Sequence, residues 1–226
     1  YELVRIGGKE DGGYLVPLDL EGISRCISPG VANVLQFEKE LLNLWNIPSL
    51  LLDASIRKPE GIDARLKFLP RFLGPEDQND FVSLMTLVSE SKSEDYAPDF
   101  LLQMDIEGWE IPTLISTNSG LLEAFRIIIV EFHNLQEWQS SLYFNTVIKP
   151  LFAKLNNIFD IVHVHPNNCD GIFYFGKRQY PRSLEITFHL KSRNRKTLDK
   201  VEFRRIPHSL DFDNSSKMPK IKIDFS

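Results

Sequence analysis

The feature that most constrains the fold is the segment at residues 100–110, FLLQMDIEGWE. A nearly continuous apolar run of strand length leads into a turn at Gly108 that carries two carboxylates, Asp105 and Glu107. Continuous rather than alternating apolar residues are typical of a strand that helices cover on both faces. In an open parallel sheet, ligands bind outside the carboxyl ends of the strands. The segment therefore predicts a central parallel strand that ends at a binding site.

The rest of the chain alternates strand-like and helix-like runs, which is the pattern of an α/β fold with a parallel sheet. Residues 37–45 and 145–159 each place apolar side chains on one helical face. The last two strand-like runs alternate apolar with polar residues, so we expect them to form a hairpin. The expected strands are residues 24–28, 49–53, 65–73, 100–105, 126–133, 160–165 and 183–190.

The length of 226 residues fits one sizeable domain. We place this domain at residues 1–191, with residues 1–23 as a segment that precedes the first sheet strand. Residues 192–226 are polar and charge-dense without an obvious buried period, so we interpret them as a charged C-terminal tail.

Charge and cysteine content exclude several classes of protein. A formal net charge of -5 gives no strong basic field, so we expect no nucleic-acid partner. Cys26 and Cys169 fit neither a disulfide framework nor a paired metal motif, which favours a reducing, cytoplasmic compartment. No apolar run approaches the ~20 residues that span a bilayer, so no membrane segment is expected. The chain begins at Tyr1 rather than at a methionine, which leaves room for a targeting or anchor segment before it.

Asp53 ends the second expected strand, where an acid can accept both hydrogen bonds of a ribose diol. The alternative is a helix N-cap, a position that favours aspartate. Asp105 and Glu107 suit a cofactor amino group, a substrate hydroxyl or a divalent cation. Their alternative use is structural: Glu107 would cap a helix that starts near Trp109, and Asp105 would accept backbone hydrogen bonds.

Glu131 and His133 end the strand at residues 126–133 and are two positions apart, so both side chains point to one face. A neutral imidazole with a pKa of about 6.5 suits a general base that takes a proton from an acceptor hydroxyl. Glu131 would orient that base, or would join Asp105 and His133 in holding a divalent metal. Alternatively, the acid and the imidazole only hydrogen-bond each other.

His163 and His165 repeat this spacing and are followed by Asn167 and Asn168. Asparagine both donates and accepts hydrogen bonds, as binding of sugar hydroxyls requires, so these four residues predict a substrate-binding surface. A histidine on a strand is also commonly structural. Zinc bound through His163, His165 and Cys169 is a third interpretation, although the spacing matches no standard zinc finger.

The order of these motifs resembles the FkbM-like family of S-adenosylmethionine-dependent methyltransferases. The matching pieces are RIGGKEDGGYLV at residues 5–16, CISPGVANVLQFEKEL at 26–41, LLQMDIEGWE at 101–110, IIIVEFHNL at 127–135 and VHVHPNNC at 162–169. The resemblance implies a Rossmann-like, seven-stranded, mostly parallel sheet with helices on both faces and an antiparallel last strand. It also implies S-adenosylmethionine as the cofactor.

The same resemblance implies cofactor contacts in two further segments. One is the loop after the first sheet strand, with Ser28, Gly30 and Asn33, where members often carry an acid and several glycines. The other is a lid on the cofactor side formed by residues 1–23; its glycine-containing turn could close over the ligand. The lid residues expected to contact the cofactor are Arg5, Asp11, Gly12, Gly13 and Tyr14.

The implied activity is O-methylation of a hydroxyl on a sugar, a glycan or a natural product, with fold-level analogy as its basis. Two rivals remain open. A non-catalytic module that binds S-adenosylmethionine or a nucleotide would keep the fold without the chemistry. A nicotinamide-dependent oxidoreductase is less favoured, because the first loop lacks a GxGxxG motif. A nucleic-acid methyltransferase is weaker still, since the only dense basic segment, residues 193–205, also contains acids.

Overall fold

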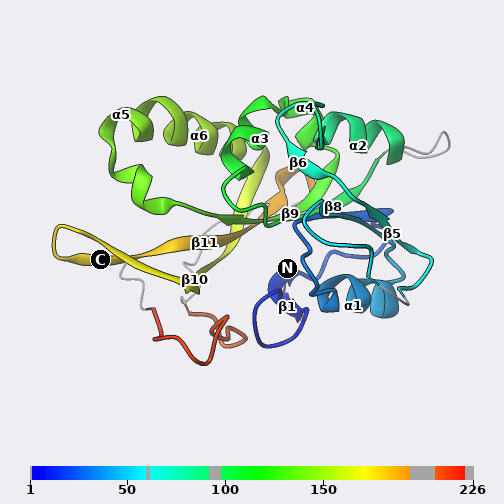
Figure 1. Cartoon of the computed structure of the whole chain (residues 1–226), viewed down its shortest axis with the longest axis horizontal. Coiled ribbons are helices and arrows are strands. Elements are labelled where there is room, and N and C mark those ends of the chain that lie inside the picture. The colour runs from blue at the N-terminus through cyan, green and yellow to red at the C-terminus, as the bar shows by residue number, and fades with distance from the viewer. Residues whose placement is uncertain (1, 60–61, 92–97, 194–206, 222–226) are drawn as a thin grey trace.

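Seven strands form one sheet at the centre of the structure, a computed structural model that describes residues 2–59, 62–91, 98–193 and 207–221 (Figure 1). Five neighbouring strands are parallel, and the last strand runs antiparallel between its two neighbours. This arrangement confirms the Rossmann-like fold class. The spatial order is β10 (Phe159–Phe175), β11 (Arg178–Leu190), β9 (Phe125–Phe132), β8 (Phe100–Met104), β3 (Arg25–Pro29), β4 (Ser49–Leu52) and β5 (Leu66–Leu69).

Every residue of β8 and β9 is buried, which confirms that the run at 100–105 is a central strand. Successive side chains of a strand point to opposite faces, so both faces need an apolar partner. In β9, Ile128 and Val130 pack into the larger hydrophobic core, whereas Ile127 and Ile129 pack into the core on the other face. Burial on two faces is the reason that the sequence of these strands does not alternate.

Helices cover both faces of the sheet (Figure 1). On one face, α1 (Gln36–Trp45) packs with the two-stranded hairpin of β1 (Leu3–Ile6) and β2 (Tyr14–Pro17). None of the described helices is long and apolar enough to cross a bilayer. The elements associated with the other face are α2 (Leu84–Ser91), α3 (Glu110–Ser116), α4 (Ser119–Leu122) and α6 (Lys149–Ile158), with α5 (Ser141–Tyr143) and a π-helical turn (Phe144–Ile148) before α6.

The expected strand at residues 65–73 is wrong in one respect, because it is two strands. β5 ends at Leu69, and β6 (Phe72–Gly74) pairs instead with β7 (Phe81–Ser83) in a separate small sheet. Pro70 lies between β5 and β6 and has no backbone N–H to donate to a ladder. The expected helix at 145–159 is α-helical only from Lys149, and the closing hairpin is longer than expected.

Part of the expected tail lies against the domain. Residues 207–221 contact both the β10–β11 hairpin and the loop between β1 and β2. Asn214 is buried, and its Nδ2 donates to Asp11 Oδ1 and to Glu185 Oε1. Asn168 and Ser215 exchange two hydrogen bonds of 2.9 Å. The described part of this segment is therefore fixed to the domain rather than separate from it.

Candidate active site

The candidate residues meet at one edge of the sheet because they follow neighbouring parallel strands. Asp53 follows β4, Asp105 follows β8, and Glu131 and His133 lie at the end of β9. β3 lies between β4 and β8. The chain first continues from β3 to its neighbour β4 on one side, and later returns to the other side of β3 with β8. Such a switch point is where open α/β sheets bind ligands.

The turn after β8 is held by a residue that the sequence interpretation missed, Glu110. Glu107 and Gly108 both have positive φ, 55° and 104°. Glu110 Oε1 accepts hydrogen bonds from the amides of Ile106 and Gly108, each 3.1 Å long. The expected cap by Glu107 is wrong: α3 begins at Glu110 without a side-chain cap, and the Glu107 side chain is 87% exposed. Glu107 is therefore free to face a ligand.

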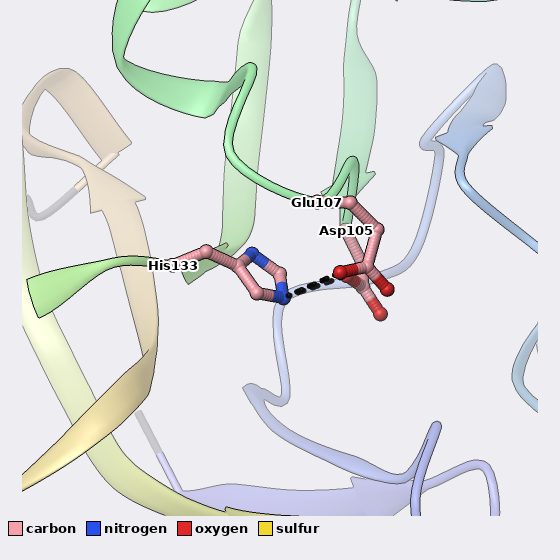
Figure 2. Close-up of side chains that lie close together, drawn as sticks. All are labelled: Asp105, Glu107 and His133. Atoms are coloured by element: carbon pink, nitrogen blue, oxygen red, sulfur yellow. Dashed lines mark ion pairs between the residues drawn. The ribbon is translucent and has the colours of Figure 1, made fainter. Parts of the chain in front are cut away.

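His133 is the centre of the cluster, and only 8% of it is exposed. Its Nδ1 lies 3.0 Å from Glu110 Oε1. Its Nε2 points toward the turn that carries Asp105 and Glu107, and Figure 2 shows these three side chains converging from two strand ends. Four carboxylate oxygens surround Nε2, at 3.6 Å in Asp105, 3.6 Å in Glu107, 3.7 Å in Glu131 and 3.9 Å in Asp170.

This crowding of acids changes the protonation of the cluster. Burial lowers the pKa of His133, but the hydrogen bond to Glu110 and the charges of Glu110, Asp105 and Glu107 outweigh burial and raise it to about 9. Burial, with Glu107 and other acids, raises the pKa of Asp105 to about 7. The pKa of Glu131 is raised well above its usual value by burial and by Asp105. The ordinary pKa of about 6.5 expected for His133 is therefore wrong, because the surrounding acids raise it.

The same atoms could hold a cation. Ligand atoms lie within 4.8 Å of one another in the group Asp105, Glu107 and His133, and also in the group Glu131, His133 and Asp170. Imidazole nitrogen and carboxylate oxygen are common ligands of divalent metals. The contacts of Nε2 at 3.6–3.9 Å are longer than hydrogen bonds and resemble the spacing of atoms around a shared ion. The two groups share His133, and metal binding by Asp105, Glu131 and His133, the set expected from the sequence, stays a prediction.

A polar pocket opens beside Nε2. Its volume is about 310 Å³. Each residue of its lining has a polar or charged side chain, which suits a ligand rich in hydroxyl groups. The lining residues are Glu107, His133, Asn134, Gln136, Asp170 and Arg182.

Two of the expected cofactor residues lie where the first loop meets the sheet edge. Asp53 Oδ2 accepts from the Ala32 amide at 2.9 Å, and Oδ1 accepts from the amide and hydroxyl of Ser55 at 2.8 and 2.6 Å. Gly30 has a φ of +82°, and a Cβ there would overlap the carbonyl oxygen of Asp105. Asn33 is exposed in the same loop. Asp53 thus holds the loop, and a ribose contact stays a prediction.

Ser28 and Tyr14 lie in a buried polar network instead of at the surface. Ser28 is completely buried, and its Oγ contacts Glu38 Oε1 and Gln103 Oε1. Gln103 Nε2 donates to the hydroxyl of Tyr14 at 3.1 Å. Burial raises the pKa of Glu38. The expected cofactor contacts of Ser28 and Tyr14 stay predictions.

The N-terminal side of the expected lid loop is held by two hydrogen bonds. Arg5 Nε donates to the carbonyl of Gly8, and the Gly7 amide donates to Glu40 of α1 at 2.8 Å. Its tip is brought to the acid cluster: Asp11 has an oxygen within 4.8 Å of oxygens of Glu131 and Glu185. Gly12 and Gly13 form the turn next to it, where Gly12 has a φ of +79°.

The expected substrate surface is divided between the site and the C-terminal segment. Asn167 Nδ2 donates to Glu131 Oε1 at 2.7 Å, so Asn167 supports the cluster directly. His163 Nε2 lies 2.9 Å from Asp211, and His165 Nε2 lies 3.2 Å from Asn214 Oδ1. Asn168 bonds Ser215. A substrate role for these four residues stays a prediction, as does zinc binding that includes the exposed Cys169.

The residues that the sequence interpretation missed do not lie at the end of an expected strand. Glu110 is three positions after Glu107 in DIEGWE, and its place at the start of a helix was the available signal. Asp170 and Arg182 come from the closing hairpin, and nothing local in the sequence connects them to β8.

Three comparisons with known proteins were made. No protein of curated function matches the chain. Among solved structures, a Streptococcus pneumoniae protein named as a candidate tRNA (m1A22) methyltransferase, in complex with S-adenosyl-L-methionine, is 10% identical, with a TM-score of 0.40 over 76% of this chain and 68% of its own. The delta-N METTL16 methyltransferase domain is 8% identical, with a TM-score of 0.30 over 74% and 73%. The model of the methyltransferase FkbM domain matches residues 31–165, more than half of the sequence, and the chain belongs to this family of methyltransferases.

Proposed function

We propose that the chain transfers the methyl group of S-adenosylmethionine to a hydroxyl of a sugar, a glycan or a related polyhydroxylated natural product. The observation that carries the proposal is the polar pocket of about 310 Å³ beside His133, at the sheet edge where the family match predicts the cofactor. An apolar acceptor would find little apolar surface in this lining, whereas a polyol finds donors and acceptors.

The chain's part in this reaction is alignment and removal of one proton. When bound, the cofactor supplies a methyl carbon that is activated by a sulfonium. The chain would hold the acceptor oxygen in line with that carbon and its sulfur, and a side chain would take the hydroxyl proton as the methyl group passes from sulfur to oxygen. Asp105 suits this base, because a pKa of about 7 is close to neutral pH. The positive charge of His133 lowers the pKa of Asp105, against the larger effect of burial, and so favours the ionised form that a base needs. Glu131 is the third member of the expected catalytic set.

A divalent cation at Nε2 of His133 is the second form of this proposal. The cation would be held by His133 with Asp105 and Glu131, and Glu107 and Asp170 lie within reach. It would replace the protons that the cluster holds and would orient neighbouring hydroxyls of the acceptor. Magnesium or manganese suits a site dominated by carboxylates.

Cofactor binding is the step that the proposal shares with its rivals, a binding module without catalysis and a nicotinamide-dependent oxidoreductase. Both oxygens of Asp53 already accept hydrogen bonds from the chain, so a ribose diol must share them. A cytoplasmic location and the lack of a nucleic-acid partner stay predictions.

The experiment is calorimetric titration with S-adenosylhomocysteine, with and without Mg²⁺, with NAD as the competing ligand. Micromolar binding of S-adenosylhomocysteine alone supports the proposal, and binding of NAD alone refutes it. Asp53→Ala should weaken this binding about tenfold or more, as expected for lost hydrogen bonds to a charged group. Asp63→Ala is the matched control, because Asp63 is exposed and pairs only with Arg65 among the described residues.

Turnover is then measured with a panel of sugars and polyols as acceptors. Asp105→Asn should keep S-adenosylhomocysteine binding and lower kcat by about 10²–10⁴-fold, the usual value of a general base. His133→Ala should also spare cofactor binding and reduce turnover. Binding without turnover on any acceptor would favour the non-catalytic module.

A further inference from the structure

Glu110 connects the two segments that carry the candidate catalytic groups. It is 1% exposed and lies at the first position of α3. One oxygen, Oε1, contacts the amides of Ile106 and Gly108 in the turn after β8, and the imidazole Nδ1 of His133 after β9. The second oxygen, Oε2, is buried without a hydrogen-bond partner.

We propose that Glu110 is a positioning residue for methyl transfer, which fixes the ring of His133 and the turn bearing Asp105 and Glu107 in the geometry that reaction requires. The inference rests on the proposed function. Glu110 does not touch the pocket, whose lining includes Glu107 and His133. It acts through them.

The first argument concerns the imidazole. A carboxylate that accepts from Nδ1–H holds the ring in one orientation, whether or not Nε2 also carries a proton. Nε2 of His133 is then the nitrogen left to face the acceptor pocket and the four surrounding carboxylates. If the ring could rotate by a half-turn about the Cβ–Cγ bond, Cε1 would take the place of Nε2 and would face the acceptor.

The second argument concerns the turn. A non-glycine residue in the left-handed region, such as Glu107, strains the backbone, so the turn needs a stabilising contact. The two amides that bracket Glu107 both point at Glu110, and hydrogen bonds to an ionised acceptor are stronger than those between neutral groups. Glu110 thus holds Asp105 and His133 to one another through a single oxygen.

A structural role alone would not need the charge. Glutamine at this position keeps an oxygen for the two amides, and its amide nitrogen would replace the unpartnered Oε2. Glu110→Gln should therefore still fold, with a loss of stability limited to the lost ion pair with His133. It should nevertheless lose the ionic partner of His133, so the substitution separates support of the fold from positioning of the imidazole.

The test measures the pKa of His133 by NMR in the full chain, with its signal assigned by its absence in His133→Gln. In Glu110→Gln the pKa of His133 should fall by about one unit or more, because the charge that raises it is gone. The kcat should fall about tenfold or more, as for other residues that orient a functional histidine. Affinity for S-adenosylhomocysteine should stay within about twofold. Glu123→Gln, an exposed glutamate at the end of α4, is the matched control and should change none of these values.

Unchanged His133 titration and unchanged kcat in a folded Glu110→Gln variant would overturn the proposal. A loss of kcat that Glu123→Gln shares would also overturn it, since the effect would then be general. If the wild type transfers no methyl group, the proposed function fails, but the titration still decides whether Glu110 orients His133.

Discussion

Replacement of Gly30 by alanine should damage both stability and the candidate site. Gly30 has a φ of +82°, and its missing Cβ would overlap the carbonyl oxygen of Asp105. Gly171, in the irregular stretch of β10, has a nearly equal φ of +78°, but a Cβ added there would meet no heavy atom within 4 Å among the described residues. The pair of variants therefore separates backbone strain from steric overlap.

The expected losses of stability follow from the backbone strain and the steric overlap. Strain alone should cost Gly171→Ala about 1 kcal/mol of the free energy of unfolding. Gly30→Ala carries the same strain and must also displace the backbone of Asp105, an overpacking cost of about 2 kcal/mol, for about 3 kcal/mol in total. At about 3 °C per kcal/mol for a chain of this size, the Tm should fall by about 3 °C in the control and by about 9 °C in Gly30→Ala.

The assays are urea unfolding and titration with S-adenosylhomocysteine. Gly30→Ala should bind the cofactor product more weakly, because Gly30 lies in the first loop that is expected to contact the cofactor and a Cβ there displaces the backbone at the end of β8, whereas Gly171→Ala should bind it normally. Equal losses of stability in the two variants, with normal binding in both, would refute the argument that the first loop and the end of β8 approach too closely for a side chain.

Three further predictions follow from individual side chains. Folding raises the pKa of His133 to about 9 and that of Asp105 to about 7, so the folded chain binds more protons than the unfolded chain between about pH 4 and 9. The free energy of unfolding should therefore fall as the pH rises through this range. Urea unfolding at several pH values should show a smaller fall between pH 7 and 9 in His133→Gln than in the wild type. Lys154→Met should cost about 1 kcal/mol in thermal unfolding, since Nζ donates to the carbonyls of Leu114 and Ile115 at the end of α3, and Lys149→Met should cost nothing measurable. Asp211→Asn should speed amide hydrogen exchange in residues 207–221, because the substitution removes the ionic partner of His163 and His165. An exchange rate no faster than in Asp213→Asn would show that Asp211 does not hold this segment to the domain.

Much of the fold could be predicted from local patterns. Four of the seven expected strands appear with ends within one residue of those expected, because apolar runs of strand length have few other ways to be buried. The two strands of the closing hairpin are also present but extend beyond the expected ranges. The run at 65–73 failed because Pro70 interrupts the ladder, although apolar content continues across it. The strand ends then placed Asp53, Asp105 and His133 at one edge, since parallel strands share their direction.

The sequence by itself determined the order of the strands along the chain, the family motifs and the carboxylates at the strand ends, because each is encoded by neighbouring residues. Tertiary structure alone decided the roles of Glu110, Asp170 and the docked segment at 207–221. It also decided that His133 holds its proton at neutral pH. The physical reason is that burial and Coulomb interactions act through space: the acids that raise the pKa of His133 come from other parts of the chain, and no local pattern records their distance.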